Sequence, residues 1–292
     1  MPLLVHPLPG VGAEVEGSDL AGNLPVGELD LLKSALARYG VLFFRDQNLK
    51  EADHIALAKL WGEININRFF RAHPDHPEIA LVLKEPNQQD NIGGGWHTDH
   101  SYDLVPALGS ILVARELPPF GGSTVFASMF RAYSALSEPL KRRLVGLRAV
   151  HSARHVFGTQ AAQRRNSDTR NGRIGNASAA DSLDDVTHPV VIKHPVSGLP
   201  ALYVNPGFTT HIEGLSDRES RDLLDLLFAH CQDSRFQYEF HWTQGSVAFW
   251  DNRATWHFAR NDYSGYRRLM HRITLEGCPV EAAPFHLARA LA

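Results

Sequence analysis

The last quarter of the chain is a series of short apolar runs separated by turn residues, and this series constrains the fold more than any other feature. Such runs, rich in β-branched and aromatic residues, are typical of strands. Helical patterns lie near the start of the chain and in a few segments between predicted strands. They lack the regular alternation of strand and helix that a doubly wound sheet requires. The sequence therefore predicts a mainly β protein with flanking helices, as an antiparallel sandwich or barrel. The runs cover residues 237–242, 246–250, 255–259 and 267–275.

Apolar periodicity places the remaining elements. Residues spaced by three or four predict helices, and short apolar runs next to glycines predict buried strands. The predicted helices are 26–39, 51–61, 132–145 and one that begins at a capping box of Ser216 and Glu219. The predicted earlier strands are 41–44, 79–83, 110–114, 123–126, 146–152, 188–193 and 201–205, whereas 64–77 is predicted to be irregular.

One internal segment differs from its surroundings. Residues 159–187 are rich in Ser, Asn, Asp, Arg and Gly and hold almost no large apolar residues, so this segment can bury little surface. Long loops inside compact domains are usually functional or disordered. With no repeat and no convincing linker elsewhere, we predict one domain over 1–292 with a mobile flap at 159–187. A solvated insertion without a role is the alternative.

Composition excludes several classes of protein. The 292 residues are 43% hydrophobic, which is ample for a core, and a net charge of −3 without a basic run argues against nucleic acid. The apolar runs are too short to span a bilayer. Two cysteines, Cys231 and Cys278, cannot form a disulfide framework. We therefore predict a cytoplasmic protein without a membrane or nucleic-acid partner, and we expect a homo-oligomer.

The glycine-led stretch 93–100, GGGWHTDH, carries half of a candidate metal site. If this stretch is extended, alternate side chains share a face, so His97 and Asp99 point the same way. Two imidazoles and one carboxylate, with positions left open for a cosubstrate and oxygen, suit non-haem Fe(II). The pair therefore predicts that a second histidine lies nearby.

The late strands offer that histidine and two arginines. His257 lies in the run 255–259, and in an extended strand Arg268 and Arg272 share a face, whereas Arg267 and His271 take the other. Two cations on one face require two anions or one large one. The alternative is that both arginines form surface salt bridges.

The ordered set of these motifs resembles the taurine dioxygenase family of Fe(II)- and 2-oxoglutarate-dependent oxygenases. The set comprises HTD at 97–99, GGST at 121–124, WDNR at 250–253, His257 and RRLMHR at 267–272. The resemblance covers residues from about 41 to about 277. It implies a double-stranded β-helix, also called a jelly roll or cupin-like fold, with flanking helices.

The resemblance also implies a role for each matched residue. His97, Asp99 and His257 would be the iron ligands, and Thr124 and Arg268 would hold the distal carboxylate of 2-oxoglutarate. Arginine suits this role because its guanidinium makes two parallel bonds to a carboxylate. The implied reaction consumes O2 and 2-oxoglutarate, releases succinate and CO2, and hydroxylates a substrate carbon.

The substrate is implied less directly. Arg272 matches the position that binds the substrate's anionic group. Asn67 stands where taurine dioxygenases have a sulfonate-contacting histidine, and Gly93 stands where they have an asparagine. Both departures argue against taurine, and the run HSARHVFG at 151–158 is similar to the aryloxyalkanoate-cleaving branch. We therefore expect a small organic anion of the aryloxyalkanoate, sulfonate or sulfate-ester class.

Two other classes of protein remain open. A hydrolase using another metal at the same residues would need no carboxylate anchor, and Thr124 with Arg268 argues against it. A non-catalytic cupin-like binding protein would tolerate the loss of a ligand, whereas His97, Asp99 and His257 are all present.

Overall fold

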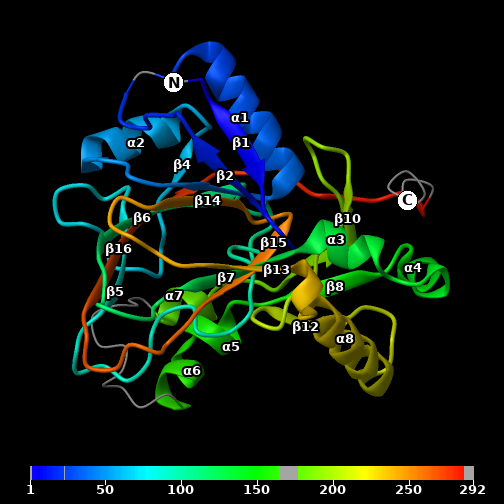
Figure 1. Cartoon of the computed structure of the whole chain (residues 1–292). Coiled ribbons are helices and arrows are strands. Elements are labelled where there is room, and N and C mark those ends of the chain that lie inside the picture. The colour runs from blue at the N-terminus through cyan, green and yellow to red at the C-terminus, as the bar shows by residue number, and fades with distance from the viewer. Residues whose placement is uncertain (1, 23, 165–176, 286–292) are drawn as a thin grey trace.

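The computed structural model describes residues 2–22, 24–164 and 177–285, and within these ranges a large sheet dominates (Figure 1). Its strands are β1 (Leu4–Pro7), β2 (Ala13–Glu16), β3 (Val41–Phe44), β4 (Ile64–Asn65), β5 (Ala80–Lys84), β6 (Gly109–Glu116), β14 (Val247–Asp251) and β16 (Arg268–Leu275). Their order is β1-β2-β3-β14-β6-β16-β4, and β5 also pairs with β16. Apart from the parallel pair β2 and β3, neighbours are antiparallel.

A small sheet packs on the inner face of the large one. It contains β13 (Gln237–Phe240), β7 (Thr124–Ser128) and β15 (Thr255–Ala259), in that order. The Phe43 ring of the large sheet stacks on Phe240 at 4.3 Å and meets Phe126 edge-on at 5.4 Å. Because side chains alternate along a strand, each sheet sends one set of residues into this shared core. The predicted mainly β architecture with antiparallel pairing is confirmed. Of the two predicted forms, sandwich or barrel, the face-to-face packing of the two sheets matches the sandwich.

The chain crosses repeatedly between these two sheets. β6 is followed by β7, and β13, β14, β15 and β16 then alternate between the small and the large sheet. Two further sheets of three strands extend the molecule. They contain β12 (Thr209–Ile212), β8 (Arg148–His151) and β9 (Val186–Pro189), and β11 (Pro200–Leu202), β10 (Val191–Lys193) and β17 (Glu281–Ala282).

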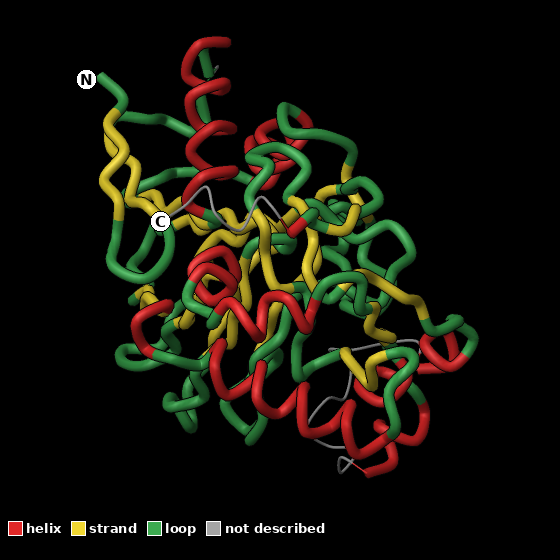
Figure 2. The backbone as a smooth tube through the Cα atoms, turned by 90° about the vertical axis from the view of Figure 1, so that its right-hand side faces the viewer, coloured by secondary structure: helices red, strands yellow, loops and turns green. Residues whose placement is uncertain are grey.

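Helices cover the outer faces of the sandwich (Figures 1 and 2). Leu36 of α1 (Val26–Tyr39) and Leu57 of α2 (Glu51–Lys59) belong to one apolar cluster with the large sheet. Met129 of α3 (Met129–Ser134) and Leu227 of α8 (Asp217–Cys231) pack on the small sheet. The shorter helices are α4 (Glu138–Leu144), α5 (Arg154–Phe157), α6 (Thr159–Arg164), α7 (Ala177–Asp181) and the 3-10 turn η2 (Ser234–Phe236). Among the described residues, none of the helices combines the length and the apolar composition that a membrane-spanning segment needs.

The helices predicted over 26–39, over 51–61 and after Ser216 are confirmed as α1, α2 and α8, whereas the one predicted over 132–145 is wrong. Before α8, the Ser216 hydroxyl accepts from the Glu219 N–H and the Glu219 carboxylate accepts from the Ser216 N–H, which is the predicted capping box. The single helix predicted over 132–145 is instead α3 and α4. Ser137 between them is extended, and Pro139 lies in the first turn of α4. Proline is tolerated in a first turn but not in a helix interior, so it begins a new helix.

Several boundaries differ from the prediction. The strand predicted over 188–193 is divided between β9 and β10, and the irregular segment 64–77 begins with β4, a two-residue strand paired with β16. Within 159–187, the structure has α6, α7 and the start of β9. Residues 165–176 of the predicted flap lie outside the described residues, and the flap stays a prediction.

Candidate active site

Two of the predicted ligand residues face each other across a backbone bridge. His257 lies in the middle of β15, and His97 pairs with it as an isolated antiparallel bridge. The His97 N–H donates to the His257 carbonyl at 3.2 Å, and the His257 N–H donates to the His97 carbonyl at 2.9 Å. Directly opposed residues put their side chains on one face. The two imidazole centroids are therefore 4.2 Å apart.

The carboxylate of Asp99 reaches the same face by a route that the alternation argument did not predict. Only His97 of this stretch has a strand-like partner, and the chain turns at Asp99. The Thr98 hydroxyl between them contacts the carbonyls of Asn252 and Thr255 at 2.6 and 2.9 Å, which ties the turn to the base of β15. The extended prediction is wrong beyond His97, whereas the predicted convergence is found.

The distances within this triad and the orientation of its His97 ring suit a metal ion. Asp99 Oδ1 is 3.5 Å from His97 Nε2, and Asp99 Oδ2 is 3.7 Å from His257 Nε2. His97 Nδ1 donates to the Gly95 carbonyl at 2.8 Å, so in the neutral ring Nε2 keeps its lone pair toward Asp99. These three groups offer ligand atoms that lie within 4.8 Å of one another.

Burial and neighbouring charges keep Asp99 and His257 in their ligating forms. Burial, together with the nearby His97, lowers the pKa of His257 to about 3, which leaves a neutral imidazole at pH 7. Burial alone would raise the pKa of Asp99, but Arg272 and the two imidazoles outweigh it and hold that pKa well below its usual range. The site therefore offers a carboxylate and a neutral imidazole without any need to lose a proton first.

A buried ion pair holds the turn that leads into β15. Both oxygens of Asp251 accept from the Arg253 guanidinium, at 2.9 and 2.7 Å, and Oδ1 also accepts from the Arg253 backbone N–H at 2.8 Å. His194 Nε2 lies 3.0 Å from Asp251 Oδ2. These contacts fix the turn before His257 and join it to His194, which the sequence did not suggest.

The triad opens into a cavity of about 360 Å³ between the two sheets. Arg268 and Arg272 of β16 both line it, as their shared face predicted, so they are not surface residues. The cavity wall is otherwise largely apolar. Its apolar side chains include Phe70, Val82, Ile92, Trp96, Phe157 and Phe208.

The cavity wall also contains the buried guanidinium of Arg268, which has hydrogen-bond donors unpaired within the described part of the chain. The Arg268 side chain is 3% exposed, and its Nε and Nη2 have no hydrogen-bond partner among the described residues. The Thr124 hydroxyl also lines the cavity and accepts from Trp242 Nε1 at 3.0 Å, and the Trp242 ring lies 5.9 Å from the Arg268 guanidinium. Such buried donors require an anionic partner. No sequence signal identified Trp242, which follows a strand without any motif.

The two residues predicted to bind substrate occupy different positions. Arg272 Nη1 donates to Asp99 Oδ2 at 3.2 Å, and its guanidinium lies 4.4 Å from the Phe70 ring. The side-chain amide oxygen of Asn67, Oδ1, accepts from the backbone N–H groups of Phe69 and Phe70, and Asn67 does not line the cavity. Asn67 thus positions the loop that carries Phe70, and a direct contact with substrate stays a prediction.

Comparison with known proteins agrees with this geometry. The family model described as "Taurine catabolism dioxygenase TauD, TfdA family" matches residues 4–274. The alpha-ketoglutarate-dependent sulfate ester dioxygenase of Pseudomonas putida is 34% identical over 94% of this chain and 89% of its own. The alpha-ketoglutarate-dependent 2,4-dichlorophenoxyacetate dioxygenase of Burkholderia sp. (strain RASC) is 31% identical, covering 96% of this chain and 95% of its own.

A solved structure supports the same assignment. The crystal structure of a taurine dioxygenase from Burkholderia xenovorans superposes with a TM-score of 0.78 at 34% identity, covering 99% of both chains. Alpha-ketoglutarate is another name for 2-oxoglutarate, so the relatives share the predicted cosubstrate. The chain therefore belongs to the TauD/TfdA family, and it is an Fe(II)- and 2-oxoglutarate-dependent dioxygenase.

Proposed function

We propose that His97, Asp99 and His257 hold the Fe(II) ion of this dioxygenase. The observation that carries the proposal is the convergence of two imidazoles and one carboxylate, from separated parts of the chain, beside a cavity with two arginines. Three ligands on one side of an ion leave positions for 2-oxoglutarate and oxygen. When bound, Fe(II) would activate O2 so that decarboxylation of 2-oxoglutarate is coupled to hydroxylation of a substrate carbon.

The same proposal assigns the distal carboxylate of 2-oxoglutarate to Arg268 and Thr124. The Nε and Nη2 groups of Arg268 are the adjacent pair of donors that a carboxylate accepts side by side. The Thr124 hydroxyl uses its oxygen as an acceptor for Trp242, and its own proton remains for the second carboxylate oxygen. Trp242 thus orients the Thr124 hydroxyl and packs near the Arg268 guanidinium.

This assignment predicts a specific kinetic effect of Arg268→Ala. Loss of a buried charge pair costs about 2 kcal/mol or more, so the KM for 2-oxoglutarate should rise about 30-fold or more. Steady-state succinate release at varied 2-oxoglutarate measures it. Arg267→Ala is the matched control, because Arg267 turns outward to Glu85 and Glu116, and its KM should stay at the wild-type value. If the two substitutions change the KM for 2-oxoglutarate equally, Arg268 does not bind its distal carboxylate.

The substrate in our proposal is a small organic anion with an apolar body. Arg272 supplies the positive charge, and the aromatic side chains of the cavity supply an apolar wall. The sulfate ester and dichlorophenoxyacetate enzymes among the relatives have names that fit this class. An anion that pairs with Arg272 competes with Asp99 for its donors, so substrate binding would change the charge felt by the iron ligands.

Several broader features belong to the same proposal. The alternation of β13, β14, β15 and β16 between two sheets supports a double-stranded β-helix, or jelly roll. Free thiols at Cys231 and Cys278 support a reducing cytoplasmic location. The single domain over 1–292, the flap at 159–187 and the homo-oligomer are retained as predictions.

Succinate release tests the proposed function. Anaerobically iron-loaded protein would receive 2-oxoglutarate and air with a panel of alkyl sulfate esters, sulfonates, aryloxyalkanoates and other carboxylates. We expect one anionic class to stimulate succinate release, with a hydroxylated or cleaved product in equal amount. A panel that leaves succinate release at its substrate-free level would reject this substrate class. Absence of both succinate and 2-oxoglutarate binding would favour a binding protein instead.

A further inference from the structure

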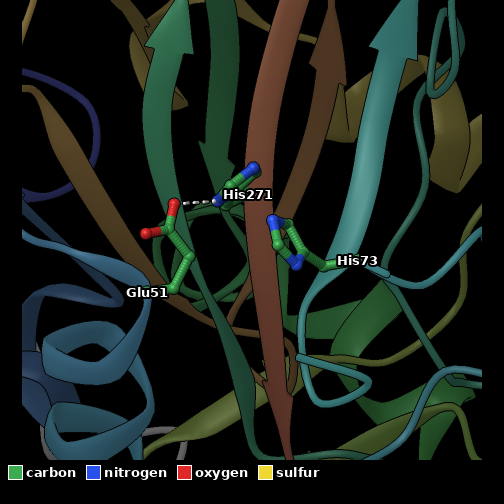
Figure 3. Close-up of side chains that lie close together, drawn as sticks. All are labelled: Glu51, His73 and His271. Atoms are coloured by element: carbon green, nitrogen blue, oxygen red, sulfur yellow. Dashed lines mark ion pairs between the residues drawn. The ribbon is translucent and has the colours of Figure 1, made fainter. Parts of the chain in front are cut away.

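A second cluster of metal-ligand side chains lies on the outer face of the large sheet. Glu51 is the first residue of α2, His73 lies in the loop between β4 and β5, and His271 lies in the middle of β16. Figure 3 shows these side chains converging from three separate elements. Their ligand atoms lie within 4.8 Å of one another. Because neighbours along a strand alternate, His271 points away from the cavity that Arg272 lines.

The cluster has a buried base and an accessible rim. His271 is 4% exposed, and its Nδ1 is 3.4 Å from Glu51 Oε1. The His73 ring lies edge-on to the His271 ring with centroids 5.3 Å apart, and both His73 and Glu51 are only partly buried. A tetrahedral ion with bonds of about 2.0–2.1 Å needs donors about 3.3 Å apart. The two rim residues can make that small adjustment, and an ion can reach them from solvent.

The Arg115 guanidinium is the positive charge that now lies against this cluster. Its Nε donates to His271 Nδ1 at 3.0 Å, and its Nη2 lies 3.6 Å from Glu51 Oε1. Burial, with Arg115 nearby, lowers the pKa of His271 to about 4, so the ring is neutral at pH 7 and Nδ1 carries the lone pair that Arg115 uses. A metal ion would bind the same lone pair and the same carboxylate. Arg115 therefore competes with it.

We propose that Glu51, His73 and His271 form a second divalent-metal site, suited to Zn²⁺, Co²⁺ or Ni²⁺, with Arg115 as a competing cation. Imidazole and carboxylate ligands favour these ions over Ca²⁺ or Mg²⁺, which take all-oxygen sites. Three protein ligands leave a further position for water. The His76 ring, 5.2 Å from His73, is the nearest additional imidazole on the same loop. The site shares no residue with the proposed iron ligands.

Metal stoichiometry tests the proposal without using activity. The full chain would be dialysed against Co²⁺ or Zn²⁺, and bound metal per chain would be measured together with Co²⁺ absorption. We expect two ions for the wild-type protein, one for His97→Ala and one for His73→Ala. His211→Ala should retain two, because His211 is an exposed histidine outside both clusters. Glu51→Gln repeats the test at a second partly buried position, where a folding defect is not expected.

The competing arginine supplies the second arm of the test. Arg115→Met keeps a long unbranched side chain but removes the charge and the donor to His271, so the affinity for metal at the outer site should rise above that of the wild type. If His73→Ala and Glu51→Gln bind as many ions as the wild type, the cluster is an ion pair of Glu51 with Arg115 and the proposal is overturned. An unchanged metal affinity in Arg115→Met would show that Arg115 does not compete with the ion.

Discussion

His97→Ala is expected to abolish succinate release that depends on iron. Substitution of groups that merely support metal ligands costs about 10–100-fold in affinity or activity, so loss of a proposed ligand should cost more than about 100-fold. Asp99 and His257 would remain, but two ligands cannot hold the ion in the same open geometry. Succinate release under saturating 2-oxoglutarate and Fe(II), with and without substrate, measures the effect.

The control for this substitution is another histidine on the molecular surface. His211→Ala changes an exposed side chain whose Nδ1 lies 3.1 Å from the neighbouring Thr210 hydroxyl. Its turnover should match that of the wild type. Circular dichroism of both variants would establish that they fold. Wild-type turnover in folded His97→Ala would disprove the metal assignment.

The second large effect concerns stability. Asp251→Asn keeps the shape of a side chain that is 1% exposed but removes the charge facing Arg253, which is itself buried. Breaking a buried ion pair on one side leaves an uncompensated charge and typically costs about 3–5 kcal/mol. We therefore expect the free energy of unfolding, measured by urea denaturation at pH 7, to fall by about this amount.

The chain contains a matched control for Asp251. Asp233 and Arg235 repeat the spacing and the contacts of Asp251 and Arg253, because Asp233 accepts from the Arg235 backbone N–H and from Nε and Nη2 of its guanidinium. This second pair is on the surface, where water screens the charges, so Asp233→Asn should change stability little. Similar losses from both substitutions would show that the spacing, and not burial, determines the effect.

The contribution of the Asp251 carboxylate to stability also depends on pH. Burial would raise the pKa of Asp251, but Arg253 and His194 outweigh it and hold the pKa far below the usual value of 3.8. A carboxyl with a depressed folded-state pKa contributes stability above its unfolded pKa, and this contribution is lost as the pH falls toward the folded value. The difference between wild type and Asp251→Asn should therefore be constant above about pH 5 and shrink below about pH 4.

Local pattern was sufficient where a single segment determines its own structure. The apolar runs became strands, and Ser216 with Glu219 capped a helix, because both depend on residues a few positions apart. Alternation along β16 correctly separated Arg268 and Arg272 from His271. The pattern failed over 132–145, where apolar spacing continued past Ser137 although Pro139 began a new helix.

The ordered motifs determined the family and named His97, Asp99 and His257, but only the tertiary structure decided how they meet. The chain has 16 histidines, and no local pattern indicated that His73 and His271 would meet in an outer cluster, although the motifs had named His97 and His257 for the inner one. Sheet pairing and helix packing bring together residues that are far apart in sequence, and burial then sets their charges. Sequence therefore determined the elements and their faces, whereas packing determined which faces became sites.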